Sequence, residues 1–149
     1  MKRLAIILLA VVACKTAAPA PPTPMGSQTG ASSPRTAVEL FMRAVKAQDL
    51  QAMSAVWGTE KGPARETLSR DQVDKRELIM QCYLGHDTYH ILSSAPARNG
   101  ATAFQVSLTK GPLTRQTTVS TVRGPSNRWY VDDVAIPPVK DLCRESAGG

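Results

Sequence analysis

The stretch ATAFQVSLTKGPLTRQTTVSTV, residues 101–122, decides the fold because it has the pattern of two strands joined by a tight break. In its first half, Phe104, Val106 and Leu108 alternate with polar residues, so these three side chains would share one face of a strand. Lys110-Gly111-Pro112 interrupts the alternation, and the β-branched run that follows favours a second strand. The stretch therefore predicts a hairpin with one apolar face.

Strand patterns continue on both sides of this hairpin. On the N-terminal side, TYHILSS at residues 88–94 leads to Asn99-Gly100, a pair that strongly favours a short hairpin turn. On the C-terminal side, GPSN indicates another turn, and RWYVDDVAI at residues 128–136 precedes two prolines. The sequence thus predicts a four-stranded antiparallel meander.

The first half of the domain has helical periodicity instead. Ser33 and Pro34 suit the N-cap and first position of a helix, and Asp49 suits the cap of a second helix. A third helix should begin with the capping box at residues 69–72 and end at Gly85. The side chains expected to face inward on it are Val73, Leu78, Ile79 and Cys82. These patterns predict an α+β domain with helices packed on one sheet face.

The order of these elements resembles a known superfamily. The segment AVELFMRAVKAQD, residues 37–49, fits the helix-pair pattern AVxxFxxAxxxxD, and the last strand carries WYV at residues 129–131. Over residues 34–134 the chain resembles the nuclear-transport-factor-2-like superfamily, in particular a small lipid-anchored bacterial branch of unknown function. The resemblance implies a curled sheet that forms a cone around the helices and can hold a small apolar ligand. A cystatin-like sheet wrapped on a helix is the alternative fold.

The chain begins with an apolar leader, MKRLAIILLAVVAC at residues 1–14. Its apolar part, residues 4–14, would span about 16 Å as a helix, against roughly 30 Å for a bilayer core. The basic start and the short apolar run predict an export signal over residues 1–13. The ending Val11-Val12-Ala13-Cys14 resembles the bacterial lipobox, which implies cleavage after Ala13 and lipid attachment to Cys14. A plain secretory signal is the alternative.

Composition separates a linker from the domain. Residues 15–33 are nearly all Ala, Pro, Thr, Ser and Gly, which cannot bury enough apolar surface to offset the entropy lost on ordering. We therefore expect a lipid-anchored flexible linker over residues 14–33, a folded domain over residues 34–143 and a disordered tail over residues 144–149.

The number of cysteines in the chain, three, supports lipid attachment to Cys14. A lipid on Cys14 would leave Cys82 and Cys143 as a pair, and compartments outside the cytosol permit disulfides. Closing a loop of this length would stabilise the fold by about 4 kcal/mol in the chain-entropy model. Two separate thiols are the alternative, because spacing does not show that the residues meet.

The charge of the chain argues against nucleic-acid binding. The formal net charge is +6, and removal of Lys2 and Arg3 with the leader would leave +4. The basic residues are scattered along the sequence without interleaved aromatic residues, unlike those of a nucleic-acid-binding surface. We therefore predict no nucleic-acid partner.

Both histidines of the chain lie in CYLGHDTYH, residues 82–90. On a strand, His86 and His90 would be about 13 Å apart, too far to chelate one metal ion. No metal-binding, nucleophile or phosphate-loop motif occurs in the sequence. The sequence therefore predicts no metal and no cofactor.

Acid–base catalysis would need Asp87 or Asp132 in an apolar pocket, beside Tyr130 or a histidine. A structural role is the alternative for the carboxylates in the last strand. Asp132 and its neighbour Asp133 would then pair with an arginine on an adjacent strand, either Arg115 or Arg123. No catalytic residue is assigned.

These observations leave three kinds of function open: a binding module, an enzyme and an interaction protein. The expected function is a non-catalytic small-ligand or protein-binding module, and the alternative is an isomerase-like or dehydratase-like enzyme that uses an acid–base residue in the cone. The expected partners are the membrane, a small apolar ligand or envelope protein, and a second copy in a homodimer. The expected location is the periplasmic face of the outer membrane in the cell envelope. The residues expected to line the pocket are Phe41, Trp57, Tyr83, His86, Asp87, Tyr89 and Leu108.

Overall fold

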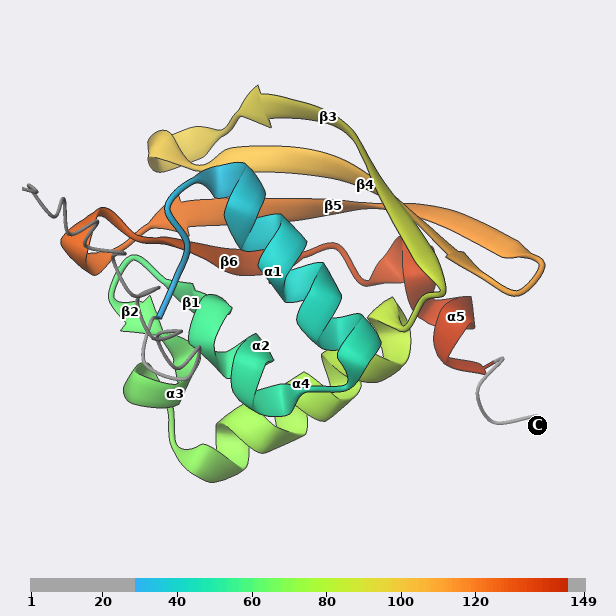
Figure 1. Cartoon of the computed structure of the whole chain (residues 1–149), viewed down its shortest axis with the longest axis horizontal. Helices are drawn as coiled ribbons and strands as arrows, with labels where there is room; N and C mark the ends of the chain where they lie inside the picture. The colour runs from blue at the N-terminus through green and yellow to red at the C-terminus, as the bar shows by residue number, and fades with distance from the viewer. Residues whose placement is uncertain (1–28, 145–149) are drawn as a thin grey trace, which may run out of the picture.

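The computed structural model describes residues 29–144 as an α+β domain, with helices on one face of a four-stranded sheet (Figure 1). This arrangement confirms the predicted fold class. The bounds of the helices and strands are α1 Pro34–Ala47, α2 Leu50–Val56, β1 Gly58–Thr59, β2 Gly62–Pro63, α3 Ala64–Thr67, α4 Arg70–Leu84, β3 Thr88–Pro96, β4 Thr102–Lys110, β5 Leu113–Arg123, β6 Trp129–Val134 and α5 Lys140–Arg144.

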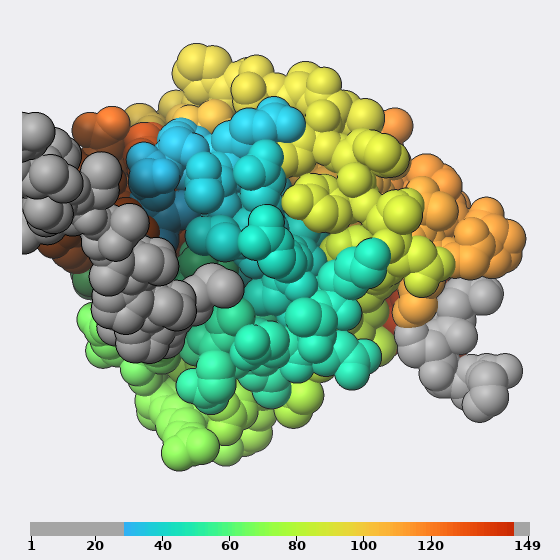
Figure 2. Space-filling model, in the orientation of Figure 1, coloured from blue at the N-terminus to red at the C-terminus, as the bar shows by residue number. Residues whose placement is uncertain are grey.

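The sheet is the predicted antiparallel meander, with strand order β3-β4-β5-β6. In the β4–β5 hairpin, Phe104 pairs with Val119 and Val106 with Thr117. Phe104, Val106, Leu108 and Val119 are each at most 3% exposed and belong to the core beneath α1. Figure 2 shows α1 and α2 over much of this side of the molecule, with the tip of the β4–β5 hairpin projecting beyond them.

The predicted helix starts are confirmed by their hydrogen bonds. Ser33 Oγ accepts from the Thr36 amide at 3.1 Å, and Asp49 Oδ1 accepts from the Ala52 amide at 3.0 Å. Both hydrogen bonds of the capping box between Ser69 and Gln72 are present at the start of α4. These caps depend on residues only three positions apart, so the local sequence is sufficient to predict them.

The predicted inner face of α4 is wrong in part. Val73 is buried, but Leu78 and Ile79 are 55% and 54% exposed. The residues that face inward are Val73, Glu77 and Leu84, because α4 packs against α1 and α2 along that stripe. The inner stripe therefore includes the carboxylate of Glu77, which apolar periodicity could not predict because that pattern counts only apolar residues.

The folded unit starts earlier than the predicted boundary at Pro34. Ala31 is 1% exposed and forms a β-bridge with Trp129, and the Gly30 amide donates to the Ala55 carbonyl at 2.7 Å. Arg128 Nη2 donates to the Gly30 carbonyl at 2.7 Å. At least residues 29–33, assigned to the linker from composition, thus belong to the domain. Backbone pairing holds them, and that needs no apolar side chain.

Three small elements were not predicted: the β1–β2 hairpin, α3 and α5. Their strands are two residues long and these helices four or five residues long. Segments of this length carry too little periodicity to be recognised. They are ordered by contacts with β6, α4 and the loop before α5.

The sheet is not strongly curled, which corrects the expected curled form (Figure 1). Phe41 from α1 and Leu108 from β4 are fully buried in the core, so both residues fill the space that a hollow cone would leave open. Because α1 packs directly on the inner sheet face, the strands do not have to close around an empty interior.

Cys82 and Cys143 form the predicted disulfide, which joins the end of α4 to α5 with the two Cα atoms 4.8 Å apart. That separation lies within the usual range for a disulfide. Cys14 and the leader fall outside the described residues. Within residues 29–144, none of the helices is long and apolar enough to cross a membrane.

Candidate functional site

The candidate site is built around Asp132 on β6. Thr121 of β5 lies opposite Val131 and Ser120 lies opposite Asp133, so Asp132 is the extra residue of a β-bulge. A bulge turns a side chain out of the regular alternation, and bulges are often found next to binding sites. Here the bulge lets Asp132 line a cavity between β6 and α4.

This Asp132 cavity has a volume of about 220 Å³ and is mostly apolar. Trp57, at the end of α2, lies on one side, and Met80 of α4 lies on another. The full set of lining residues is Trp57, Arg76, Ile79, Met80, Asp132, Asp133, Val134 and Ile136. Ile79, which the helical periodicity predicts to face inward, is exposed and lines this cavity.

One of the two oxygen atoms of the Asp132 carboxylate is buried. Its Oδ1 atom is shielded from solvent and has no hydrogen-bond partner among the described residues. Burial raises the pKa of Asp132, and the charge of Asp133 adds to this rise. Hydrogen bonds from the Asp132 and Asp133 backbone lower the pKa and partly offset the burial effect. A buried polar atom without a partner is costly, and a ligand that donates a hydrogen bond would remove that cost.

The arginines expected to pair with the β6 carboxylates have other partners. Arg115 Nε donates to Asp141 Oδ2 at 2.8 Å, which ties β5 to α5. The Arg123 guanidinium lies over the Trp129 ring, 5.0 Å from its centroid. The prediction of an ion pair between these arginines and Asp132 is therefore wrong, since the bulge directs Asp132 toward α4.

The residues predicted to line one pocket are distributed over several places. Trp57 lines the Asp132 cavity, while Phe41 and Leu108 are buried in the core. His86 and Asp87 line a second cavity. Tyr83 and Tyr89 are partly buried and pack against the core, and Tyr130, proposed as an acid–base partner, instead donates to Thr29 Oγ1 at 3.4 Å.

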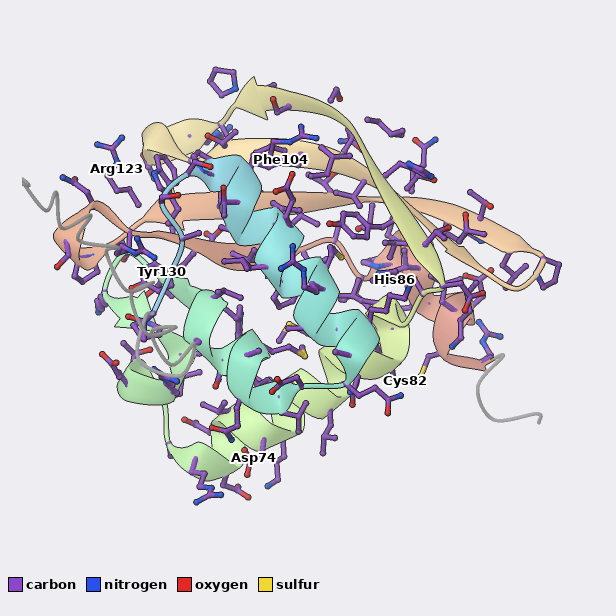
Figure 3. All side chains as sticks on the ribbon, in the orientation of Figure 1. Asp74, Cys82, His86, Phe104, Arg123 and Tyr130 are labelled. Carbon is purple, nitrogen blue, oxygen red and sulfur yellow. A yellow bond between two sulfur atoms is a disulfide. The ribbon has the colours of Figure 1, made fainter. Side chains whose placement is uncertain are left out.

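The second cavity, called here the His86 cavity, has a volume of about 360 Å³. It lies where the end of α1 meets the last turn of α4 and the loop before β3. Figure 3 shows His86 in this region, with Cys82 farther along toward α5. Its lining residues are Val45, Lys46, Gln48, Leu78, Gln81, Cys82, Gly85, His86, Asp87 and Lys110.

The structure also shows a buried carboxylate that the sequence did not single out. Glu77 is 1% exposed on the inner face of α4. The bulge at Asp132 could not be predicted, because an extra residue is defined only by the register of the neighbouring strand.

Within residues 29–144, no three side chains of His, Cys, Asp or Glu are placed to hold a metal ion.

Comparison with protein-family models and with curated proteins finds no match to this chain. The functional interpretation therefore depends on the geometry of the two cavities and on the sequence patterns.

Proposed function

We propose that this chain is a lipid-anchored cell-envelope protein whose domain binds a small, mainly apolar ligand in the Asp132 cavity without transforming it. The ligand carries one hydrogen-bond donor, such as an ammonium or hydroxyl group, that pairs with Asp132. The domain is proposed to be a member of the nuclear-transport-factor-2-like superfamily in which helix α1 packs on a sheet that is not strongly curled.

The envelope location is supported by the sequence of the leader and by the cysteines. The leader at residues 1–13 followed by Cys14 has the pattern of a lipoprotein export signal. A disulfide such as Cys82–Cys143 persists in oxidising compartments. The lipid on Cys14 would anchor the domain to a membrane, with the outer membrane favoured because Lys15, not aspartate, follows Cys14.

The observation that carries the binding proposal is the unpartnered Oδ1 atom of Asp132 in a mostly apolar cavity. Small-molecule sites combine apolar walls with a few polar groups that orient the ligand. Trp57, Met80 and Ile136 would supply the apolar contacts, and Asp132 would supply the oriented acceptor. The volume of about 220 Å³ suits a small amphipathic molecule.

Titration of the full-length chain with benzylammonium chloride, followed by calorimetry and by amide NMR, tests this proposal. We expect saturable binding with shifts at Trp57 and Met80. Asp132→Asn should weaken binding at least about tenfold, because it removes a hydrogen bond to a charged acceptor. Glu66→Gln is the control and should change affinity little, since Glu66 is exposed and is not among the residues that line the cavity. Equal affinities of the two variants, or no binding to the wild type, would refute the proposal.

A second candidate function is acid–base catalysis by Asp132, in an isomerase-like or dehydratase-like reaction. The raised pKa of Asp132 favours it, because a general acid or base works best with a pKa near the working pH. Binding is preferred because the described lining includes neither a histidine nor a tyrosine to complete a proton relay. Turnover of a bound ligand that depends on pH and is lost in Asp132→Asn would establish catalysis instead.

A further inference from the structure

The Asp132 cavity is lined by charged groups of opposite sign that come from different elements. Arg76 lies on α4, and Ile79 and Met80 follow it by three and four positions, so these three lining residues share one face of the helix. Asp132 and Asp133 line the cavity from β6. A mostly apolar space therefore has a guanidinium on its helix side and two carboxyl groups on its strand side.

The opposite charges of this cavity do not pair with each other. Within residues 29–144, the Arg76 guanidinium forms no ion pair, whereas Arg70 on the same helix lies 3.9 Å from Asp74. Arg76 and Asp133 are both exposed, so each can turn toward a ligand without burying a new charge beforehand. A molecule that carries both a cation and an anion could pair with both sides of the cavity without breaking an existing ion pair.

The strand side of the cavity favours a positively charged group. Burial is the largest cause of the raised pKa of Asp132, and the charges of Asp133 and Glu60 raise it further. The Oδ1 atom of Asp132 is buried without a hydrogen-bond partner among the described residues. An ammonium would supply the missing donor and would also offset the repulsion among the three carboxylates, whereas a hydroxyl group would supply only the donor.

We propose that the ligand of the Asp132 cavity is a small zwitterionic amino acid with an aliphatic part. Its ammonium would pair with Asp132 and Asp133. Its carboxylate would pair with Arg76, whose planar guanidinium matches the two oxygens of a carboxylate. The aliphatic part would contact Trp57 and Met80. This inference rests on the binding function proposed above and names the chemical class of the ligand.

The size of the cavity favours a single amino acid over a longer molecule. Its volume of about 220 Å³ is smaller than the range of roughly 300–1,000 Å³ that is typical of sites for drug-sized ligands. The two charges of the ligand are separated either by one carbon, as in an α-amino acid, or by the whole aliphatic chain, as in an ω-amino acid. Both kinds share the ammonium, the carboxylate and the aliphatic part, and the experiment distinguishes them.

The test compares matched ligands by calorimetry and amide NMR of the full-length chain. L-leucine is compared with isoamylamine, and ε-aminocaproate with pentylamine, because each amine lacks only the carboxylate of its amino acid. We expect at least one amino acid to bind at least about tenfold more tightly than its amine, since it adds a charged hydrogen bond to the arginine. Tighter binding of leucine assigns the site to α-amino acids, and tighter binding of ε-aminocaproate assigns it to ω-amino acids.

Arginine variants test where the carboxylate binds. Arg76 is exposed, so Arg76→Gln should fold, as the amide spectrum will show, and it should abolish the preference for the amino acid over its amine. Arg43→Gln is the matched control, at an exposed position of α1 outside the lining residues, and it should keep that preference. Saturable binding of the amines with no gain from the carboxylate, or a preference that survives in Arg76→Gln, would overturn the zwitterionic ligand and leave the proposed function standing. No binding of any of these four compounds would overturn both.

Discussion

Glu77 should make the domain less stable as the pH rises, and Glu77→Gln should remove this effect. Glu77 is 1% exposed between α4 and the first two helices, and its Oε1 atom has no hydrogen-bond partner among residues 29–144. Burial raises the pKa of Glu77 from 4.5 to about 7, with smaller contributions from the charges of Asp74 and Asp49. The folded state therefore favours the neutral carboxyl.

The sign and size of the effect follow from proton linkage. Between pH 4.5 and about 7 the folded state keeps a proton that the unfolded state has lost, so the free energy of unfolding falls as the pH rises. Each pKa unit corresponds to about 1.4 kcal/mol, which sets an upper limit of about 3 kcal/mol. Glu77→Gln stays neutral, so its advantage over wild type should grow from under about 1 kcal/mol at pH 5 to about 3 kcal/mol at pH 8.

Urea unfolding of the full-length chain at pH 5, 6, 7 and 8 measures this difference, with the fluorescence of the buried Trp57 and Trp129 as the signal. The lowered pKa of His86 makes the free energy of unfolding increase with pH up to about 6.5, which is opposite to the effect of Glu77. This contribution cancels in the comparison, because wild type and Glu77→Gln both contain His86. Glu66→Gln, at an exposed position, is the control. A stability difference between Glu77→Gln and wild type that is the same at pH 5 and pH 8 would refute the reasoning.

Three other predictions concern the anchor, the disulfide and the N-terminal segment. Cys14→Ser should abolish labelling with radioactive palmitate and release or stall the protein during export; membrane retention equal to wild type would contradict lipidation. Replacing Cys82 and Cys143 together by alanine should lower the free energy of unfolding by up to about 4 kcal/mol in urea titrations, and non-reducing peptide mapping that recovers two alkylated thiols from the wild type would exclude the bridge. Gly30→Ala should destabilise the domain by about 1 kcal/mol or more, because Gly30 has a φ of +67° and a Cβ there would lie 2.8 Å from Tyr130; an unchanged melting temperature would argue against the packing of this segment.

The local sequence was sufficient wherever the deciding residues lie within a few positions of each other. The caps at Ser33 and Asp49 and the capping box at Ser69 were predicted correctly, since each depends on residues three positions apart. The alternation of Phe104, Val106 and Leu108 likewise identified the inner face of β4. The disulfide was predicted by counting cysteines, although only the structure brings the two residues together.

Most of the candidate site could not be predicted from local sequence patterns. The sequence drew attention to His86 and Asp87, which share a cavity, but it also assigned Phe41 and Leu108 to a pocket when both are core residues. A local pattern shows which side chains are apolar, but it does not show whether the space they face is filled by another element.

The amino-acid sequence by itself determined the order of the longer helices and strands and the inward face of the β4–β5 hairpin, and it predicts export and lipid attachment. Only the tertiary structure decided that α4 turns Glu77 inward and Leu78 outward, that Asp132 is the extra residue of a bulge, and that two cavities flank α4. The physical reason is that periodicity and capping depend on neighbours along the chain, whereas burial, strand register and cavity shape depend on how surfaces distant in sequence pack together.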